Sequence, residues 1–287
     1  MKRRKHNIIQ ALEYGRNLFK NAGIESYSLD TQVILAHVLN RNREWILSHV
    51  EHEIEENDYN LFSSLVKKRA LGCPVQYITN RCEFYSLDFY IDERALIPRA
   101  DTEIITGLVI DAVSGNEKKV LEIGTGSGCI AVTVAVHCNN IIITAVDLGL
   151  DALEVATINA DRHNVTNRIK FLNIDIFSGL PNFYETFDII ISNPPYIETG
   201  QIKELPPSVR LYEPLTALDG GVDGLDFYRV IAKTGRGLLS AGGMVFLEIG
   251  STQAIGVKKI LLDNLYKDIK IIKDLSGLDR VVTGVRG

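Results

Sequence analysis

The stretch Val120-Leu-Glu-Ile-Gly-Thr-Gly-Ser-Gly-Cys-Ile-Ala131 decides the fold, because it joins a short apolar strand through a glycine-rich turn to a helix. From about residue 118 onward, apolar segments of strand length alternate with helical segments in the same way. The clearest strand segments are 119–123, 141–146, 169–172, 187–191 and 243–249. This alternation predicts an α/β fold with a parallel, doubly wound sheet and helices on both faces.

The residues before this sheet have a different character. Up to about residue 72, apolar residues recur at helical spacing, and no titratable residues stand at catalytic spacing. The next residues are rich in aromatic and β-branched types, and Val75–Ile78 and Glu83–Ile91 flank a turn, which predicts a β-hairpin. We therefore expect a helical N-terminal domain (1–72) with a role in packing or partner recognition, a hairpin linker (73–91) and a domain built on the sheet (92–287).

Composition excludes several classes of protein. With 46% hydrophobic residues the chain is too apolar to be disordered, yet it has no run of about 18 apolar residues that would suit a membrane span. Lys and Arg number 31 against 36 Asp and Glu, a net charge of −5, which disfavours direct nucleic-acid binding. The four cysteines have no CxxC spacing, so we expect reduced thiols, no metal site and a cytoplasmic location. We take a monomer as the default state.

The glycine-rich turn is a candidate ligand site. A dinucleotide-binding GxGxxG motif would need glycine at position 129, which is Cys129. Glu122 followed by GxGxG is instead the spacing of S-adenosylmethionine (SAM) methyltransferases, in which an acidic residue and backbone N–H groups complement the charged groups of SAM. The pattern favours SAM over a nucleotide, and a glycine-rich turn without a ligand is the alternative.

Two later strand ends also carry marked residues. Asp147 ends the second strand, 23 positions after Gly124, where an acid suits the two hydroxyls of a ribose. Its other interpretation is a cap for the next helix. Asp175-Ile-Phe177 follows the third strand, where an acid or an apolar residue can meet adenine, and it is equally consistent with a turn followed by core.

The tetrapeptide Asn193-Pro-Pro-Tyr196 follows an apolar strand directly and is more specific than the glycine loop. The Asn193 side-chain oxygen and the Pro194 carbonyl can accept both hydrogens of a planar –NH₂ group, and Tyr196 offers a flat face for stacking. A proline-rich loop with a turn-forming Asn is the alternative. The pattern predicts methyl transfer to an amide or aryl –NH₂ nitrogen by alignment and electrostatic stabilisation, without a nucleophilic residue or a general base.

Many segments along nearly the whole chain resemble one known family, the HemK/PrmC protein-(glutamine-N5) methyltransferases. They are Leu29–Leu39, Pro74–Thr79, Glu83–Tyr85, Leu96–Arg99 with Asp101–Glu103, Val120–Ala131, Asn193–Ile197, Glu213–Pro214 with Ala217–Leu225, Glu248–Gly250 with Gln253, and Asp279–Val282. Asn-Pro-Pro-Tyr alone is shared with DNA adenine and RNA guanine amino methyltransferases. The hairpin segment, the Leu-Ile-Pro-Arg loop and the Leu-Asp-Gly-Gly run select the glutamine branch.

The resemblance implies a Rossmann-like SAM-dependent methyltransferase that modifies the glutamine of the Gly-Gly-Gln loop in class I peptide chain release factors, with S-adenosylhomocysteine as the product. The residues that the resemblance assigns to SAM are Glu122, Gly124, Thr125, Gly126, Ser127, Gly128, Asp147, Asp175, Ile176 and Asn193. Those assigned to the glutamine are Asn193, Pro194, Pro195, Tyr196, Pro98 and Arg99, with Asn193, Pro194 and Tyr196 as catalytic residues. Asn80, Ser86, Ala100 and Ile176 depart from residues common in the family; they fall on the hairpin, a loop and an adenine contact, and leave the reaction unchanged.

Three other functions compete with this one. The first is a DNA or RNA amino methyltransferase that uses the same Asn-Pro-Pro-Tyr site, against which the acidic balance argues. The second is an NAD-linked oxidoreductase, which the position of Cys129 disfavours. The third is a non-catalytic SAM-binding partner of the translation machinery, which the intact Asn193 disfavours.

Overall fold

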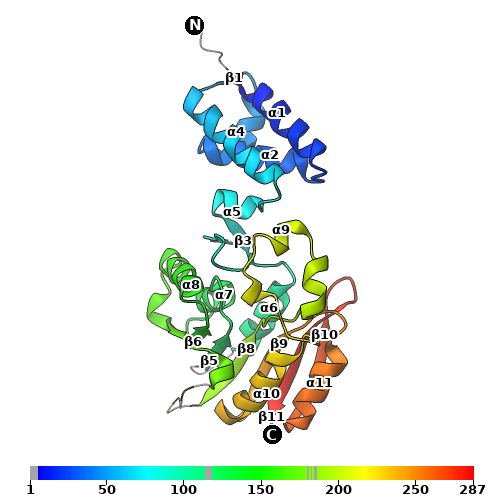
Figure 1. The fold of residues 1–287 in the computed structure, drawn as a ribbon. Coiled ribbons are helices and arrows are strands. Elements are labelled where there is room, and N and C mark those ends of the chain that lie inside the picture. Colours follow the sequence, from blue (N-terminus) through cyan, green and yellow to red (C-terminus); the bar gives the residue numbers. More distant parts are fainter. Residues whose placement is uncertain (1–5, 114–117, 180, 182, 184–185) are drawn as a thin grey trace. The chain divides into compact units, whose positions relative to one another are not determined.

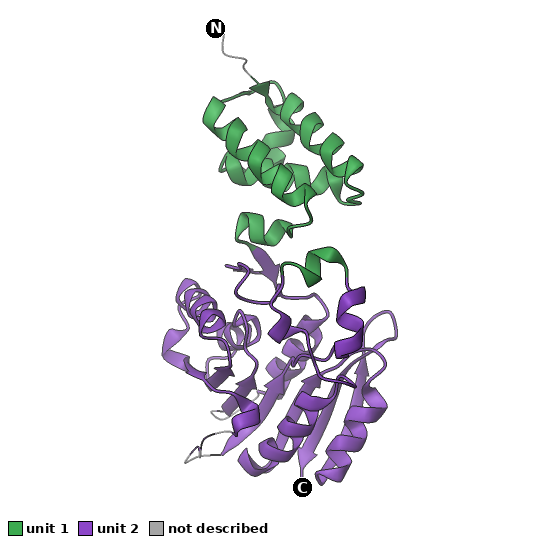
Figure 2. Cartoon of the chain, viewed as in Figure 1, with its two compact units in different colours: residues 1–81, 206–212 green, residues 82–205, 213–287 purple. Residues whose placement is uncertain are grey.

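The computed structural model describes residues 6–113, 118–179, 181, 183 and 186–287. The chain forms two compact units (Figure 2). Unit 1 comprises residues 1–81 and 206–212, and unit 2 comprises residues 82–205 and 213–287. The sequence predicts a linker over residues 73–91, and the units divide inside that range, between Arg81 and Cys82.

Unit 1 is helical. Its helices are α1 (Ile8–Asn21), α2 (Tyr27–Val38), α3 (Arg43–Ser48), α4 (Glu56–Ala70), α5 (Val75–Thr79) and α9 (Pro207–Arg210), with two-residue strands β1 (His6–Asn7) and β2 (Glu53–Ile54). Asn7 starts α1 by a reciprocal cap with Gln10, in which each side chain accepts from the other residue's backbone N–H. Phe19 and Phe62 are fully buried, and Asp30 of α2 pairs with Arg69 of α4 at 2.7 Å. Burial of such apolar faces supplies most of the stability of helices this short.

The prediction of a strand over Val75–Ile78 is wrong. This segment forms helix α5, which starts after Pro74 and ends at Asn80 in a left-handed conformation with φ of 52°. Tyr77 and Ile78 are both buried, which fits one face of a helical turn and not the alternating faces of a strand. Tertiary burial and the two helix ends therefore outweigh the preference of β-branched residues for strands.

The predicted hairpin forms only in its second part. Strands β3 (Cys82–Phe84) and β4 (Leu87–Phe89) pair antiparallel across a two-residue turn, in which Tyr85 and Ser86 both have positive φ. Phe84 and Phe89 lie buried in the core of unit 2, with ring centroids 6.0 Å apart. The hairpin is therefore part of unit 2.

Unit 2 is built on a seven-stranded sheet of order β10-β11-β9-β8-β5-β6-β7 (Figure 1). Its strands are β5 (Lys118–Ile123), β6 (Ile141–Asp147), β7 (Ile169–Asn173), β8 (Phe187–Ser192), β9 (Leu239–Glu248), β10 (Tyr266–Lys273) and β11 (Asp279–Arg286). The strands from β9 to β7 are parallel, and β11 and β10 add antiparallel strands at one edge. The predicted doubly wound α/β fold is confirmed, and its strand order reverses at β5, where β6 lies on one side and β8 on the other.

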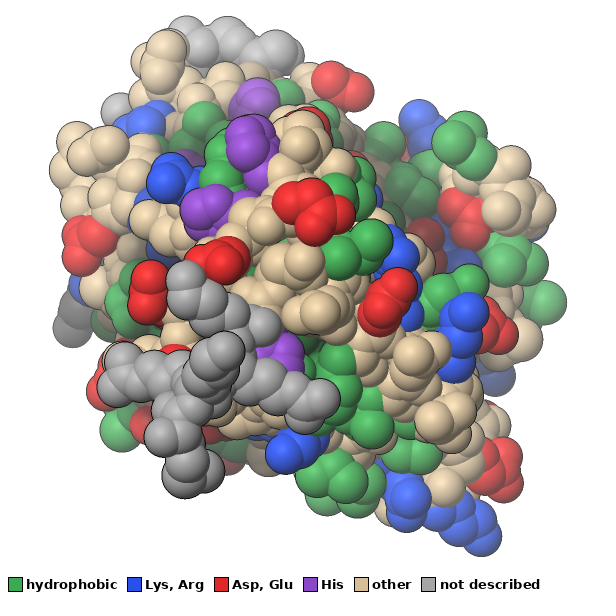
Figure 3. All heavy atoms as spheres, turned by 90° about the horizontal axis from the view of Figure 1, so that it is seen from above, with side chains coloured by type: hydrophobic (Ala, Val, Ile, Leu, Met, Phe, Trp, Pro, Cys, Tyr) green, Lys and Arg blue, Asp and Glu red, His purple; other side chains and the backbone are tan. Residues whose placement is uncertain are grey.

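Helices cover both faces of this sheet. They are α6 (Thr102–Ala112), α7 (Cys129–His137), α8 (Leu150–Arg162), α10 (Asp226–Leu238) and α11 (Ala254–Asp263), with short 3₁₀ turns η1 (Thr166–Arg168), η2 (Ile176–Ser178), η3 (Thr199–Glu204) and η4 (Leu215–Ala217). One core cluster joins the sheet to α6, α7 and the hairpin, and the other joins it to α10 and α11. Acidic and basic side chains are interspersed over the face seen in Figure 3. Across the described ranges, no helix combines the length and apolar character that a membrane crossing requires.

Candidate active site

A cavity of about 560 Å³ opens in unit 2 at the carboxyl ends of the central strands. Ile123 of β5, Asp147 of β6 and Ser192 of β8 all line it. This is the edge at which doubly wound sheets bind ligands, beside the reversal of strand order. The volume lies in the range of cofactor and small-molecule sites.

The glycine-rich turn forms one wall of the cavity, and its three glycines have different tasks. Gly124, Gly126 and Gly128 all have positive φ, of 75°, 55° and 77°. A Cβ added to Gly126 would meet nothing within 4 Å, whereas one at Gly128 would lie 3.0 Å from the Cβ of Ala156. Gly124 and Gly126 line the cavity and Gly128 does not. Gly128 is therefore required for close packing of α7 on α8, and the other two leave the backbone open to a ligand.

Glu122 lies beneath this turn and is not among the residues that line the cavity. Its Oε2 accepts a hydrogen bond of 2.7 Å from the hydroxyl of Thr125, which does line the cavity. Burial raises the pKa of Glu122 to about 8, although the bonds from Thr125 and the Ala131 backbone favour the carboxylate. Glu122 therefore holds the glycine-rich turn in place through Thr125, without reaching the cavity itself.

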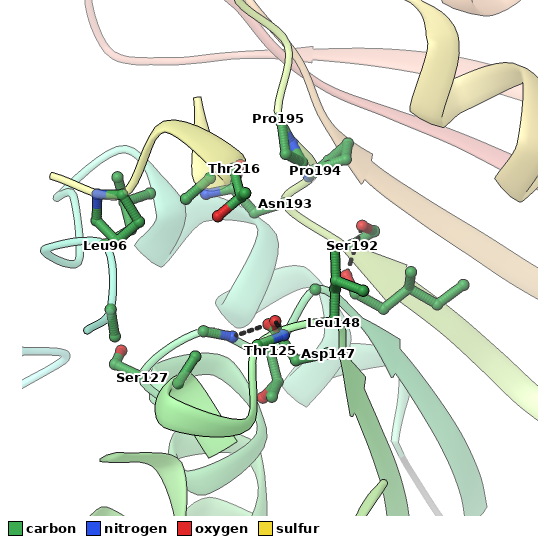
Figure 4. Close-up of a pocket in the computed structure, with 18 of the residues that line it drawn as sticks. Leu96, Thr125, Ser127, Asp147, Leu148, Ser192, Asn193, Pro194, Pro195 and Thr216 are labelled. Atoms are coloured by element: carbon green, nitrogen blue, oxygen red, sulfur yellow. Dashed lines mark hydrogen bonds between the residues drawn. The ribbon is translucent and has the colours of Figure 1, made fainter. Parts of the chain in front are cut away.

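Asp147 faces the cavity at the end of β6 (Figure 4). Its Oδ2 accepts from the backbone N–H of Gly126 at 2.8 Å, and its Oδ1 accepts from that of Gly149 at 2.9 Å. Burial raises its pKa, and these backbone bonds lower it again. The residue that caps α8 is Gly149, so Asp147 is not the helix cap of the alternative interpretation. Each of its oxygens keeps a lone pair for a hydroxyl in the cavity.

One end of the cavity is apolar and aromatic. Ile176 and Phe177, predicted from the third strand end, both line it. The ring of Phe177 meets that of Phe227, on α10, edge to face at a centroid distance of 4.9 Å. Asp175 also lines the cavity, where its Oδ1 accepts from the Phe177 backbone N–H at 2.9 Å and so holds the turn. An aromatic pair of this kind suits the face of a planar ring.

Asn193, Pro194 and Pro195 also line the cavity, next to the glycine-rich turn, because Ser192 of β8 pairs with Ile123 of β5 (Figure 4). Asn193 follows β8 directly, and its Nδ2 donates to Thr102 Oγ1 at 3.1 Å. Tyr196 is not among the residues that line the cavity, and it belongs with the apolar cluster under α10 and α11. Burial raises the pKa of Tyr196 to about 12. The structure therefore brings three of the four motif residues to the cavity.

A second loop carries Pro98 and Arg99, which also line the cavity. Arg99 Nη2 forms an ion pair of 2.6 Å with Glu213 Oε1, and Glu213 Oε2 accepts from the backbone N–H of Ile97 at 3.3 Å. The Glu213 side chain is only 1% exposed, against 40% for Arg99. Glu213 thus ties this loop to the segment that contains Thr216, across from Ser127 (Figure 4).

Several lining residues have no local signature in the sequence. They are Glu93, Arg94, Ala95, Leu148, Thr216 and Phe227. Most lie on connecting segments whose spacing carries no periodic pattern. For Phe227 the only available signal is its position on an amphipathic helix, which does not distinguish cavity from core.

Comparison with known proteins gives consistent matches. Residues 10–79 match the family described as PrmC N-terminal domain, and residues 99–205 match the methyltransferase small domain. The chain is 38% identical over 281 residues to a release factor glutamine methyltransferase of Clostridium acetobutylicum, covering 98% of this chain and 99% of that protein. A protein of the same name from Clostridium botulinum is 37% identical, with 93% and 95% covered. A methyltransferase structure from Pyrococcus furiosus superposes with a TM-score of 0.53 over 71% of this chain and 91% of that one; at 22% identity it supports the fold alone.

Proposed function

Since the chain belongs to the release factor glutamine methyltransferase family, we propose that it methylates the side-chain amide nitrogen (N5) of the glutamine in the Gly-Gly-Gln motif of class I peptide chain release factors. The methyl donor in this proposal is SAM. The observation that carries the proposal is the position of Asn193 and Pro194 at the cavity, at the end of the strand that neighbours the glycine-rich turn. Donor and acceptor surfaces therefore face one shared space.

The residues present fit SAM. Gly126 leaves open space where any other residue would carry a Cβ, so the backbone can approach an amino acid moiety closely. Asp147 can accept from both ribose hydroxyls while it holds the N–H groups of Gly126 and Gly149. Phe177 and Phe227 offer aromatic surface for adenine. When bound, SAM supplies a methyl group on a positively charged sulfur.

The substrate end of the site supplies hydrogen-bond acceptors. The Asn193 side-chain oxygen and the Pro194 carbonyl accept both hydrogens of the glutamine –NH₂ group, which turns the nitrogen lone pair toward the methyl carbon. As the nitrogen becomes positive in the transition state, the same oxygens stabilise its charge. Arg99 and Pro98 border this end, and the stacking role of Tyr196 stays a prediction. We propose that the helical unit 1 docks the release factor.

The test uses purified chain, radiolabelled SAM and an intact class I release factor. We expect label on the factor, located by mass spectrometry to the Gly-Gly-Gln peptide. The Asn193→Ala variant should retain SAM binding and lose transfer by about two orders of magnitude or more, as expected for a lost transition-state acceptor. Label on nucleic acid alone would contradict the proposal, and full activity of the variant would refute the role of Asn193.

A further inference from the structure

Glu248 is a buried carboxylate beside the catalytic wall, and the proposed reaction leaves it without a task. Strands β8 and β9 run parallel, with Ser192 paired to Leu247. Asn193 and Glu248 therefore each follow the last paired residue of two neighbouring strands. Glu248 is 3% exposed and is not among the cavity-lining residues, whereas Asn193 and Thr102 are. It lies one layer behind the site.

One hydrogen bond and a buried carboxylate surround the amide group of Asn193. Asn193 Nδ2 donates to Thr102 Oγ1 at 3.1 Å. The carboxylate of Glu248 lies beside both side chains, which lower its pKa in the way that hydrogen-bond donors do. Among the described residues its Oε2 is buried without a hydrogen-bond partner, so it offers an acceptor to the Thr102 hydroxyl and to the second Asn193 N–H. The –NH₂ group of Asn193 therefore faces Thr102 and Glu248, and its oxygen faces away from them.

We propose that Glu248, acting with Thr102, is a positioning residue that fixes the Asn193 carboxamide with its oxygen toward the substrate amide. The flipped carboxamide would present an N–H donor to the –NH₂ group of glutamine, where an acceptor is needed. It would also set the Asn193 oxygen against a carboxylate. The buried charge excludes that orientation because two acceptors would face each other in a site of low polarity. The inference rests on the proposed function for its substrate and on this contact set for its geometry.

The charge state of Glu248 gives the proposal a pH dependence. Burial raises its pKa to about 7, and the bonds from Thr102 and Asn193 lower it. The ionisable groups that face it are Asp101 of the α6 N-terminus, Arg280 of β11, Tyr196, Tyr228 of α10 and Cys129 of α7. Burial raises the pKa of both tyrosines and of the thiol, so these groups stay neutral near pH 7, and Arg280 pairs with Asp101 at 3.1 Å. Once protonated, the Glu248 carboxyl can donate a hydrogen bond, so it no longer determines which end of the Asn193 carboxamide faces it.

Steady-state kinetics with the full chain and a release factor test the proposal in three variants and one control. Glu248→Gln and Thr102→Val should lower kcat by about 10- to 100-fold, the range that a small misplacement of a reacting group produces, with the Kd for SAM within twofold of wild type. Thr102→Ser keeps the hydroxyl and should restore kcat. Thr106→Val is the matched control, since Thr106 is a buried threonine on the same helix whose hydroxyl donates only to the Thr102 carbonyl.

The pH profile separates positioning from a merely structural effect. The kcat of the wild type should fall as the pH drops through about 7, and Glu248→Gln should lack this acidic limb. Wild-type kcat in Glu248→Gln, or an unchanged acidic limb, would overturn the proposal. Equal losses in Thr106→Val and Thr102→Val would overturn it too.

A measurement without substrate keeps the inference separate from the proposed function. With selective ¹⁵N-asparagine labelling, the side-chain –NH₂ signal of Asn193 is assigned by its loss in Asn193→Asp. We expect this signal to titrate near pH 7 in wild type and not in Glu248→Gln. A signal that is independent of pH in wild type refutes the contact set, whether or not the release factor is the substrate. Failure of wild type to label the factor refutes the proposed function alone.

Discussion

The buried carboxyl of Glu122 should make the stability of unit 2 depend on pH in a direction opposite to that of a salt-bridged acid. Burial raises its pKa from 4.5 to about 8. Between these values the unfolded chain releases a proton that the folded chain keeps. The free energy of unfolding therefore falls with rising pH, by about 1.4 kcal/mol per pH unit from this one group. The contribution is absent well below pH 4.5 and complete above about pH 8.

Replacement by glutamine should remove this slope. Glu122→Gln keeps an oxygen that can accept from Thr125, whose hydroxyl now donates to Glu122 at 2.7 Å. Relative to wild type, the variant should gain about 3 kcal/mol of stability between pH 5 and pH 8, because a difference of one proton acts over roughly two and a half pH units. The slope that Glu248 contributes, with its own raised pKa, is present in both proteins and cancels in the difference.

Urea unfolding of the ligand-free protein at several pH values measures this difference. The single tryptophan, Trp45, lies in unit 1, so circular dichroism should follow unit 2 in place of tryptophan fluorescence. Glu204→Gln, an exposed residue of the same unit, is the control for a change of net charge. A difference between Glu122→Gln and wild type that stays constant from pH 5 to pH 8 would refute the raised pKa. A variant that loses stability relative to wild type as the pH rises would show that the pKa of Glu122 is lowered and not raised.

Two further predictions concern the glycine-rich turn and the acid beside it. Gly128→Ala should cost about 2–3 kcal/mol of stability in urea unfolding, because the new Cβ combines positive φ with a contact of 3.0 Å to Ala156. Gly126→Ala should cost only about 1 kcal/mol, from the backbone strain alone. Equal costs would contradict the packing role of Gly128. Asp147→Ala should weaken SAM binding about tenfold or more in calorimetry, through two lost hydrogen bonds of about 1 kcal/mol each, and an unchanged Kd would exclude Asp147 from the ribose site.

The features that the sequence predicted are those that local patterns determine. The turn after β5 and the acid at the end of β6 follow apolar runs of strand length, and parallel strands bring their carboxyl ends to one edge. Asn193 could be placed at the cavity for the same reason. Gly128 shows the limit of this reasoning, since its spacing alone does not reveal that it packs against Ala156 while Gly126 faces open space.

The features that the sequence did not predict depend on contacts between distant segments. Helix α5 forms where β-branched residues favour a strand, because Tyr77 and Ile78 are both buried inside unit 1. Thr102 lies 91 positions before Asn193, so its hydrogen bond to that side chain has no counterpart in local spacing. Tyr196 belongs to a recognisable motif, yet its ring packs with core residues, because the two prolines before it carry the chain past the cavity.

The contact between Glu248 and Asn193 depends on how β9 is aligned with β8. Phe187 pairs with Leu239, but Ile189 pairs with Met244, so β9 takes up three extra residues in a bulge between these pairs. Gly243 lies in this bulge, where a Cβ would come within 3.1 Å of the Asp188 carbonyl, so a larger residue would disturb the register. A shift of one residue in either direction would replace Glu248 by Leu247 or Ile249, both buried and apolar, and would leave the Asn193 amide hydrogens without the carboxylate. The bulge at the far end of the strand therefore determines which side chain supports the catalytic asparagine.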